Sequence, residues 1–426
     1  MKRRKFLKSA GIASAATILP ASVVFGENTP SKQITFGFVG TGGMGGSNIG
    51  RVLGLRNRGA RILGVCDVDR IHRESAAAKI NKTQGNKDCK LYGDFRDLTR
   101  RDDIDAIVIS TPDHWHALTA LDAIRHGKDV YVEKPLTLTV REGQVLVSEM
   151  LKHKRIGQMG TQQRSTRDFR FAAELVRNGA LGKLKRIEVL IPANNKYVGS
   201  TWEPQTVPDG LDYDMWLGPA PWAPFHRQRT HYQFRYNMDY AGGQTTNWGA
   251  HYLDIAQWAL GMDESGPVSV EGFGEFPQSG LFTAPTRVDF TTYYPDGTPM
   301  HVRTRTDGVY DGNIIFHGED GWLDVSRSKL KASNPQLLKT RLGENDTRLY
   351  VSKNHMGNFL DGIRNRKRTV SDLSIGHRTT TVANIGNIAM LLKRKLTWDP
   401  KTETFKNDVQ ANRLLQRPMR APWSLV

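Results

Sequence analysis

The chain has 426 residues, of which 38% are hydrophobic and 24% charged, a composition that excludes a disordered or membrane-embedded chain. Its formal net charge is +17, but no compact basic stripe with interleaved aromatic residues occurs, so we expect no nucleic-acid partner. Two cysteines, Cys66 and Cys89, are too few for a disulfide framework and do not make a zinc site by themselves.

The first 27 residues have the pattern of an export signal. A basic head that contains Arg3 and Arg4 precedes a short apolar stretch rich in Ala and Ser, which Pro20 interrupts. The paired arginines resemble the twin-arginine signal, which exports folded proteins. We therefore expect residues 1–27 to be a signal peptide and the protein to be periplasmic or otherwise exported; the alternative is a cytosolic protein with a chance basic N-terminus. No other segment reaches about eighteen uninterrupted apolar residues, so no membrane span is expected.

Residues 32–157 alternate short apolar runs with helical segments, which predicts a doubly wound parallel sheet, the Rossmann architecture. The run at 103–111 is apolar without alternation, as in a strand that is buried on both faces. The predicted strands are 34–40, 61–69, 103–111, 129–134 and 155–162, and the predicted helices are 43–56, 71–82, 116–126 and 140–152.

Residues 158–426 show a different pattern, in which extended segments follow one another without helices between them. Turn residues separate strand-like runs within 288–306 and within 313–326, so each is a predicted hairpin. We predict a second domain with an open, mainly antiparallel sheet, and hence an α/β protein of two domains. Its loop at 194–239 is long, and such loops in compact domains are usually functional. Helices are predicted at 354–362 and 379–394.

A glycine-rich loop follows the first predicted strand. Gly40, Gly42 and Gly45 form a G-x-G-x-x-G motif, which permits a sharp turn and brings a pyrophosphate close to the backbone N–H groups of a helix N-terminus. Asp67 ends the next strand, where an acid accepts hydrogen bonds from the adenosine ribose and repels a 2′-phosphate. This favours NAD, although Arg70 leaves NADP open. The predicted cofactor loop also includes Gly43 and Met44.

Residues 110–137, STPDHWHALTALDAIRHGKDVYVEKPLT, carry a specific resemblance. Thr111-Pro112, then His116, then Glu133-Lys134-Pro135 at the end of the next strand are similar to the glucose–fructose oxidoreductase / inositol dehydrogenase / rhizopine-catabolism family (Gfo/Idh/MocA). The resemblance covers nearly the whole chain. It implies a Rossmann domain joined to an α/β domain whose open sheet often mediates dimers or tetramers. It also implies that bound nicotinamide oxidises or reduces a sugar or polyol hydroxyl.

The same motif supplies further predicted cofactor contacts. Lys134 lies at the carboxyl end of a strand, where ligands bind in such sheets, and Pro135 restricts its backbone. Its ammonium would place fixed positive charge where an alkoxide develops. The cofactor residues implied by the resemblance are Thr111, Pro112, His116, Glu133 and Lys134.

A second motif, GGQTTNWGAHYLDIAQWALG at 242–261, also resembles the family. Asn247, His251 and Asp254 recur at i, i+4 and i+7 and share one helical face. Family members commonly carry Asp in place of Asn247 and use that Asp with the His as acid/base machinery. Because Asn cannot stabilise an imidazolium by charge, we expect a less basic His251. Asp254 could restore part of the negative charge, or it could instead tie down the helix. The predicted catalytic residues are Lys134, Asn247 and His251.

Candidate substrate residues lie after the fifth strand and in the long loop. Aromatic faces stack on sugar rings, and Arg and His donate to hydroxyls, although packing explains each residue about as well. No His, Asp or Glu cluster has metal-binding spacing, so no metal is expected. The predicted substrate residues are Gln163, Arg164, Tyr197, Trp216, His231, Arg235 and His251.

Together these features predict an exported oxidoreductase that acts on a secondary hydroxyl of a sugar or glycoside, with C3 as the expected position. A periplasm offers little free NAD, so we expect the cofactor to be tightly bound. The alternative is a redox-neutral glycoside hydrolase or epimerase, because transient oxidation at C3 acidifies the C2 proton and permits elimination. Hydrolysing relatives lack a lysine in this position, so Lys134 favours the dehydrogenase. A non-catalytic sugar-binding protein is a further alternative, which Lys134 and His251 oppose.

Overall fold

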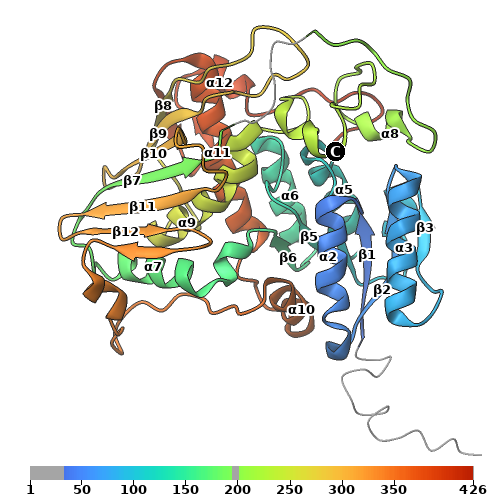
Figure 1. Cartoon of the computed structure of the whole chain (residues 1–426), viewed down its shortest axis with the longest axis horizontal. Helices are drawn as coiled ribbons and strands as arrows, with labels where there is room; N and C mark the ends of the chain where they lie inside the picture. Colours follow the sequence, from blue (N-terminus) through green and yellow to red (C-terminus); the bar gives the residue numbers. More distant parts are fainter. Residues whose placement is uncertain (1–32, 194–200, 426) are drawn as a thin grey trace, which may run out of the picture.

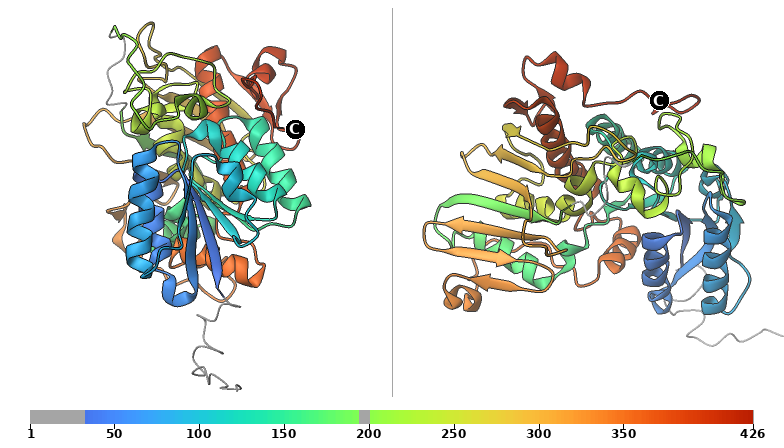
Figure 2. Two further views of the ribbon diagram at one scale, coloured as in Figure 1. Left: turned by 90° about the vertical axis from the view of Figure 1, so that its right-hand side faces the viewer. Right: turned by 45° about the horizontal axis from the view of Figure 1, so that its top comes forward.

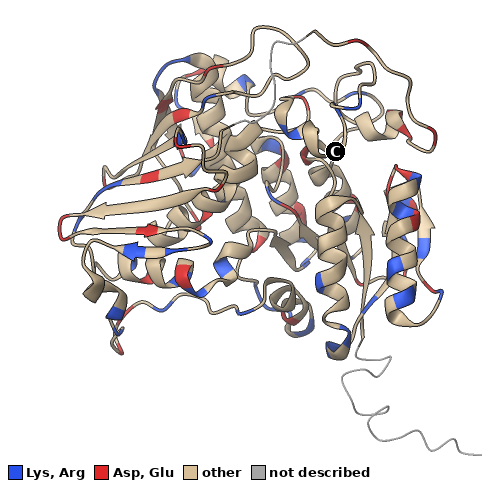
Figure 3. Ribbon diagram, viewed as in Figure 1, with Lys and Arg blue, Asp and Glu red and all other residues tan. Residues whose placement is uncertain are grey.

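The computed structural model describes residues 33–193 and 201–425 (Figure 1). The predicted leader at residues 1–27 and the predicted substrate residue Tyr197 lie outside the described residues. Within these two ranges, every helix is too short or too polar to cross a bilayer. Lysines and arginines occur in elements of both domains, with acidic residues among them (Figure 3).

The first domain is a parallel sheet of six strands in the order β3-β2-β1-β4-β5-β6, with helices on both faces (Figures 1 and 2). The order changes direction between β1 and β4, and in such sheets this switch point opens a ligand crevice at the carboxyl ends of the strands. The strands are β1 (Ile34–Val39), β2 (Ala60–Cys66), β3 (Lys90–Tyr92), β4 (Ala106–Ile109), β5 (Asp129–Val132) and β6 (Gly157–Met159). The helices are α2 (Gly43–Leu53), α3 (Arg70–Gln84), α4 (Phe95–Thr99), α5 (Asp113–Arg125) and α6 (Val140–Lys152), with a 3₁₀ turn η3 (Arg56–Arg58).

The second domain is a nine-stranded sheet in the order β13-β12-β11-β7-β10-β9-β8-β14-β15. Neighbouring strands are antiparallel except for β7 and β10, which are parallel. Both predicted hairpins form, β9 with β10 and β11 with β12. The strands are β7 (Leu184–Ile191), β8 (Ser269–Gly272), β9 (Asp289–Tyr293), β10 (Pro299–Thr304), β11 (Asn313–Gly318), β12 (Trp322–Val325), β13 (Leu330–Ala332), β14 (Leu396–Asp399) and β15 (Thr404–Phe405).

Helices from several parts of the chain pack against this second sheet and complete its apolar core. The sequence prediction missed α7, although Phe169, Ala172 and Ala173 recur there at i, i+3 and i+4. The predicted fold class, a Rossmann domain with a mainly antiparallel second domain, is confirmed. The helical elements are η4 (Gln162–Ser165), α7 (Arg167–Arg177), α8 (Tyr213–Leu217), η5 (His231–Tyr236), η6 (Thr245–Gly249), α9 (Ala250–Leu260), η7 (Pro335–Lys339), α10 (His355–Asn365), α11 (Leu373–Leu392) and α12 (Val409–Arg413).

Helix α10, which lies between β13 and β14 in the chain, returns the chain to the first domain. Its Phe359 contacts Phe36 of β1 and Tyr131 of β5 at ring-centroid distances of 6.4 and 5.8 Å. Met356 and Leu360 join the same buried cluster. The two domains therefore share a packed interface at this helix.

Arg164 of η4 and Asp254 of α9 form a buried ion pair. The Arg164 Nε donates to Asp254 Oδ2 at 2.8 Å and its Nη2 donates to Asp263 Oδ1 at 2.7 Å, while the Arg164 side chain is only 1% exposed. Asp254 Oδ1 accepts from Thr379 Oγ1 of α11 at 2.9 Å. This corrects the prediction of Arg164 as a substrate residue, because its guanidinium is enclosed by protein partners. Asp254 ties down α9.

Substitution of Arg164 by Met should destabilise the protein by about 3–5 kcal/mol, because Asp254 would remain buried without its cation. The thermal denaturation midpoint measures this loss. Arg186→Met is the matched control: its half-exposed pair with Glu188 should contribute less than about 1 kcal/mol. Equal midpoints for the two variants would show that the buried pair does not stabilise the fold.

Candidate active site

A cavity lies at the carboxyl ends of β1, β2 and β4, where the Rossmann domain meets the long loop of the second domain. It encloses about 1010 Å³ of space, part of which is open to solvent. One wall comes from the Rossmann domain and consists of Gly40, Gly42, Gly43, Met44, Asp67, Asp69, Thr111 and Pro112 together with their neighbours. The facing wall comes from the long loop and consists of Leu211, Met215, Trp216, His231, Tyr232, Phe234 and Arg235.

The glycine loop has the shape that a pyrophosphate requires. Gly40 has φ +81°, and a Cβ on Gly45 would lie 2.0 Å from the Gly40 carbonyl oxygen, so both positions need glycine. A Cβ on Gly43 would meet nothing within 4 Å, which leaves the first turn of α2 open to an approaching ligand. The backbone N–H groups at this helix start are the donors that bind phosphate oxygens. The residues present therefore fit a dinucleotide.

Asp67 lies where the adenosine ribose of such a dinucleotide is bound. Its Oδ2 accepts from the Thr41 N–H at 2.7 Å and its Oδ1 accepts from the Asp69 N–H at 2.9 Å. The Thr41 hydroxyl also donates to Oδ2 at 3.1 Å, so Oδ1 is the oxygen that keeps a lone pair for a ribose hydroxyl. The guanidinium of Arg70 pairs with Glu74 at 3.4 Å, and the carboxylates of Asp67 and Asp69 both line this end of the cavity.

Lys134 follows β5 and reaches across to the second domain. Its Nζ donates to the backbone carbonyl of Asn247 at 2.6 Å and to the Asn247 Oδ1 at 2.9 Å. Asn247 belongs to η6, a π-helical turn that precedes α9. An ammonium has three N–H groups, so one is left without a partner among the described residues. Burial, and then the charge of Arg235, lower the pKa of Lys134 to about 8.

Glu133 and His116 hold the end of β5 in place. The buried Glu133 accepts from the Asn48 side chain of α2 at 2.9 Å, which ties β5 to the helix that follows the glycine loop. The ring of His116 lies 2.7 Å from the Pro135 carbonyl through Nδ1 and 3.0 Å from the Thr111 carbonyl through Nε2. Burial lowers the pKa of His116 to about 4. A neutral imidazole has one N–H and donates to one of these two carbonyls, and the ring lies between the Thr111 loop and the Lys134-Pro135 turn.

His251 lies on α9 close to Lys134. Burial lowers the pKa of His251 well below its usual value, and the charges of Lys134 and Arg327 lower it further. Its Nδ1 has no hydrogen-bond partner among the described residues. The direction agrees with the expectation of a less basic His251, but the cause differs, because the Asn247 side chain bonds to Lys134 and Gln244.

Two further residues with shifted pKa values, Asp113 and Tyr310, were not selected from the sequence. Burial raises the pKa of Asp113 to about 7, against the opposing charges of Arg235 and Lys134. Burial alone would raise the pKa of Tyr310, but hydrogen bonds from Tyr232 and from neighbouring groups outweigh burial and lower it. Asp113 stands within the quoted family motif, which could have drawn attention to it, whereas only the fold brings Tyr310 to this site.

Trp216 and His231, both predicted as substrate residues, lie in the wall of the cofactor cavity. Trp216 is buried and stacks on Tyr213 at 5.9 Å, and its carbonyl accepts from the Trp115 indole. Arg235 lines the same cavity and affects Lys134, so it lies nearer to the catalytic end. Gln163, also predicted as a substrate residue, is buried in η4.

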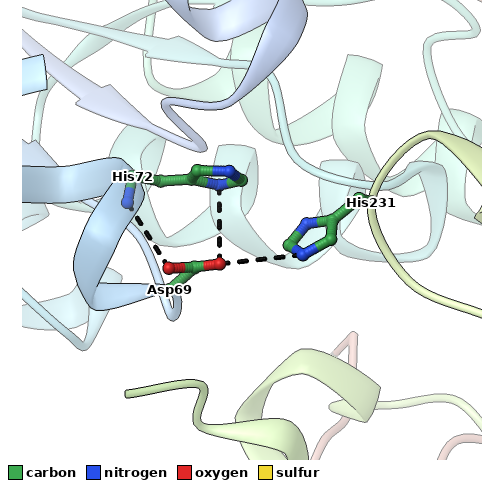
Figure 4. A group of neighbouring side chains, drawn as sticks. All are labelled: Asp69, His72 and His231. Atoms are coloured by element: carbon green, nitrogen blue, oxygen red, sulfur yellow. Dashed lines mark hydrogen bonds and ion pairs between the residues drawn. The ribbon is translucent and has the colours of Figure 1, made fainter. Parts of the chain in front are cut away.

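Asp69, His72 and His231 meet at the adenosine end of the cavity (Figure 4). The His231 Nε2 lies 3.7 Å and the His72 Nδ1 4.0 Å from the same Asp69 Oδ2, so both rings face one carboxylate oxygen. Such a donor set can bind a divalent cation or accept and donate hydrogen bonds to hydroxyls. Sequence spacing did not indicate this group, because His231 is remote in the chain. Its place in the cavity wall favours contact with the ribose.

Family comparisons agree with this geometry. Residues 34–161 match the NAD-binding Rossmann fold of the GFO_IDH_MocA oxidoreductase family, and residues 172–425 match the C-terminal alpha/beta domain of that family. The chain therefore belongs to the Gfo/Idh/MocA oxidoreductase family and carries its NAD-binding domain.

Individual relatives are named for different activities. A glycosyl hydrolase family 109 protein from Shewanella sp. (strain W3-18-1) is 31% identical over 203 residues, and the match spans 43% of this chain and 44% of the relative, less than half of its length. The WlbA dehydrogenase from Bordetella pertussis, solved with NADH and UDP-GlcNAcA, has a TM-score of 0.63 at 17% identity and covers 86% of this chain and 99% of its own. The aldose-aldose oxidoreductase from Caulobacter crescentus, complexed with glycerol, has a TM-score of 0.64 at 17% identity with the same coverage. The two structures show the shared fold.

Proposed function

We propose that this protein is a nicotinamide-dependent oxidoreductase that acts on a secondary hydroxyl of a sugar or glycoside, at C3. The observation that carries this proposal is the Lys134 ammonium, which two Asn247 oxygens hold beside the cofactor cavity with one N–H unused. The third N–H of Lys134 can donate to a substrate oxygen. His251 lies beside it as a neutral imidazole.

Each residue has a distinct part in the reaction. The nicotinamide, when bound, supplies the acceptor or donor of hydride. The free N–H of Lys134 donates to the substrate oxygen and stabilises the negative charge that develops there as the C–H bond breaks. His251, which its lowered pKa keeps unprotonated at neutral pH, accepts the hydroxyl proton. Because Lys134 disfavours an imidazolium, His251 holds this proton only briefly.

We further propose export of the folded protein, with NAD retained in the cavity. The twin-arginine pattern of the leader supports export, and retention follows from the scarcity of free NAD outside the cytoplasm. A retained cofactor must be restored on the protein, for example by reduction of a second sugar, and the fold shared with an aldose-aldose oxidoreductase supports that cycle. A homodimer or homotetramer formed through the open sheet is also proposed.

A second candidate is redox-neutral hydrolysis of a glycoside. The similarity to a glycosyl hydrolase family 109 protein favours it. In that reaction the C3 hydroxyl is first oxidised, the C2 proton is removed and the glycosidic oxygen leaves, then water adds and C3 is reduced again. Lys134 would hold the C3 oxygen throughout, and no net change in the oxidation state of the cofactor would result.

Product analysis separates the two candidates. The protein is incubated with a panel of free sugars and nitrophenyl glycosides, each with and without a second sugar as acceptor. A keto-sugar that accumulates with a reduced acceptor supports the oxidoreductase. Release of nitrophenol without any keto-sugar contradicts it and supports the hydrolase.

Lys134→Met should lower turnover by at least about 10³-fold while NAD remains bound, because the charge at the substrate oxygen is lost and the side chain keeps a similar length. Formation of keto-sugar in the presence of a second sugar as acceptor follows turnover, and NAD content after desalting follows binding. Lys152→Met removes an exposed lysine on α6 and should change neither. Normal turnover of the Lys134 variant would refute the assigned role.

Asn247→Asp should move the alkaline limit of activity to higher pH. The ammonium form of Lys134 is the active one, so kcat/KM should stay level below about 8 and fall as the pH rises through the pKa of Lys134. A carboxylate in place of the Asn247 amide favours the ammonium and raises that pKa by about 1 unit or more. Asn334→Asp adds the same charge at an exposed helix cap and serves as the control. An alkaline limit that does not move in Asn247→Asp contradicts the proposal.

A further inference from the structure

The long loop of the second domain is bonded to the first domain. This strap, residues 201–240, belongs to the second domain by its place in the chain, yet its backbone pairs with the segment after β2. The Arg70 N–H donates to the Gly210 carbonyl at 2.9 Å, and the Asp212 N–H donates to the Val68 carbonyl at 3.1 Å. Asp69 and Leu211 form an antiparallel bridge between these two bonds. The strap is thus joined directly to the segment that carries Asp67.

The strap also has an apolar core of its own, so it keeps its shape over the cavity. Trp216 lies at its centre, 5.9 Å from the ring of Tyr213 and 4.9 Å from the ring of Tyr240. Its contact with α5 is close: Gly218 has φ +50°, and a Cβ there would lie 2.1 Å from the Trp115 ring. The cluster also contains Leu217, Ala220, Phe225, Phe234 and Ala241.

Strap and Rossmann domain together form a slot next to Asp67. Leu211 and Met215 of the strap face Phe95 and Trp115 across the cavity, and Asp67 lies at its edge. An adenine base has flat apolar faces, and the ribose that follows it presents hydroxyls to an acid. The slot therefore matches the adenosine half of a dinucleotide, with one wall from each domain.

The C-terminal tail, residues 416–425, holds the strap from outside. The Arg420 N–H donates to the Pro219 carbonyl at 2.9 Å, and the Arg420 Nε donates to the Gly218 carbonyl at 2.9 Å. Its Nη1 pairs with Asp214 Oδ1 at 2.5 Å. Arg417 donates to the Met238 carbonyl near the other end of the strap.

The same tail packs on the Rossmann domain. The ring of Trp423 lies 4.7 Å from Trp115 of α5 and 6.3 Å from Phe95 of α4, and the Arg96 guanidinium lies 5.2 Å from it. The Arg125 side chain donates to the Leu425 carbonyl at 3.0 Å. Figures 1 and 2 both place the C-terminus beside the strap and α5, although the tail begins in the second domain.

We propose that strap and tail form a clasp that encloses the adenosine half of the cofactor and sets its rate of release. In this clasp, a dinucleotide leaves the slot as the strap separates from the segment after β2. That movement pulls Gly218 away from Trp115 and breaks the contacts of Arg420 and Trp423. The tail thus acts as a latch that positions the strap without contact with the cofactor. This inference rests on the proposed function, because slow release of NAD serves a protein that retains its cofactor.

Trp423→Ala tests the latch through the dissociation rate of NAD. The protein is loaded with NAD and desalted. It is then diluted into a solution of an enzyme that consumes free NAD, and the amount of NAD that remains bound is followed over time. We expect loss at least about tenfold faster than in the wild type, and Arg420→Gln, which removes only the outer charge and its bonds, should also accelerate it. Trp222→Ala is the matched control, because Trp222 belongs to the strap and is 69% exposed; its rate should equal that of the wild type.

Equal NAD dissociation rates in the wild type and in Arg420→Gln and Trp423→Ala would overturn the clasp. If Trp423→Ala fails to fold by circular dichroism, the rate in Arg420→Gln decides alone. Rapid loss of NAD from the wild type, equal to that of the variants, also overturns it. The proposed function is judged separately: a protein that oxidises no sugar can still release NAD faster in these variants, and one with freely exchanging NAD can still oxidise sugars.

Discussion

The contact between the Lys134 ammonium and the two oxygens of Asn247 is the constraint on which the site depends. It joins the end of a Rossmann strand to the start of α9 in the second domain. A half-buried ammonium needs hydrogen-bond acceptors, since its desolvation is otherwise unfavourable. Asn247 supplies two such acceptors without adding a negative charge. Burial therefore lowers the pKa of Lys134 to about 8, and one N–H of its ammonium is free for a ligand.

Positioning groups surround that contact and make it rigid. Glu133 connects β5 to α2 through Asn48, and His116 connects the Pro135 carbonyl to α5. On the other side, the ion pair of Arg164 with Asp254 holds α9 against α11 through Thr379. The positive charge of Lys134 is thus held in place by groups that are themselves buried or paired, as electrostatic preorganisation requires.

The cofactor cavity combines a common motif with walls particular to this chain. The glycine loop and Asp67 provide for pyrophosphate and ribose, as in other dinucleotide-binding sheets. The facing wall is assembled from the strap, which the tail fastens to α4 and α5. The residues of the glycine loop and Asp67 are close together in the sequence. The facing wall of the cavity forms only when segments more than a hundred residues apart meet.

By itself, the sequence determined the two-domain α/β fold, the glycine loop with Asp67, and Lys134 and His251 as residues of interest, because strand–helix periodicity and short motifs express local backbone requirements. It could not assign Arg164, Trp216 and His231, since a guanidinium, an indole or an imidazole suits a sugar site, a buried ion pair or a cofactor wall equally well. Only the tertiary structure set their partners: Asp254 and Asp263 for Arg164, Tyr213 for Trp216, Asp69 for His231. It also decided that Asn247 serves Lys134, because a π-helical turn before α9 directs its oxygens to the lysine across the domain interface.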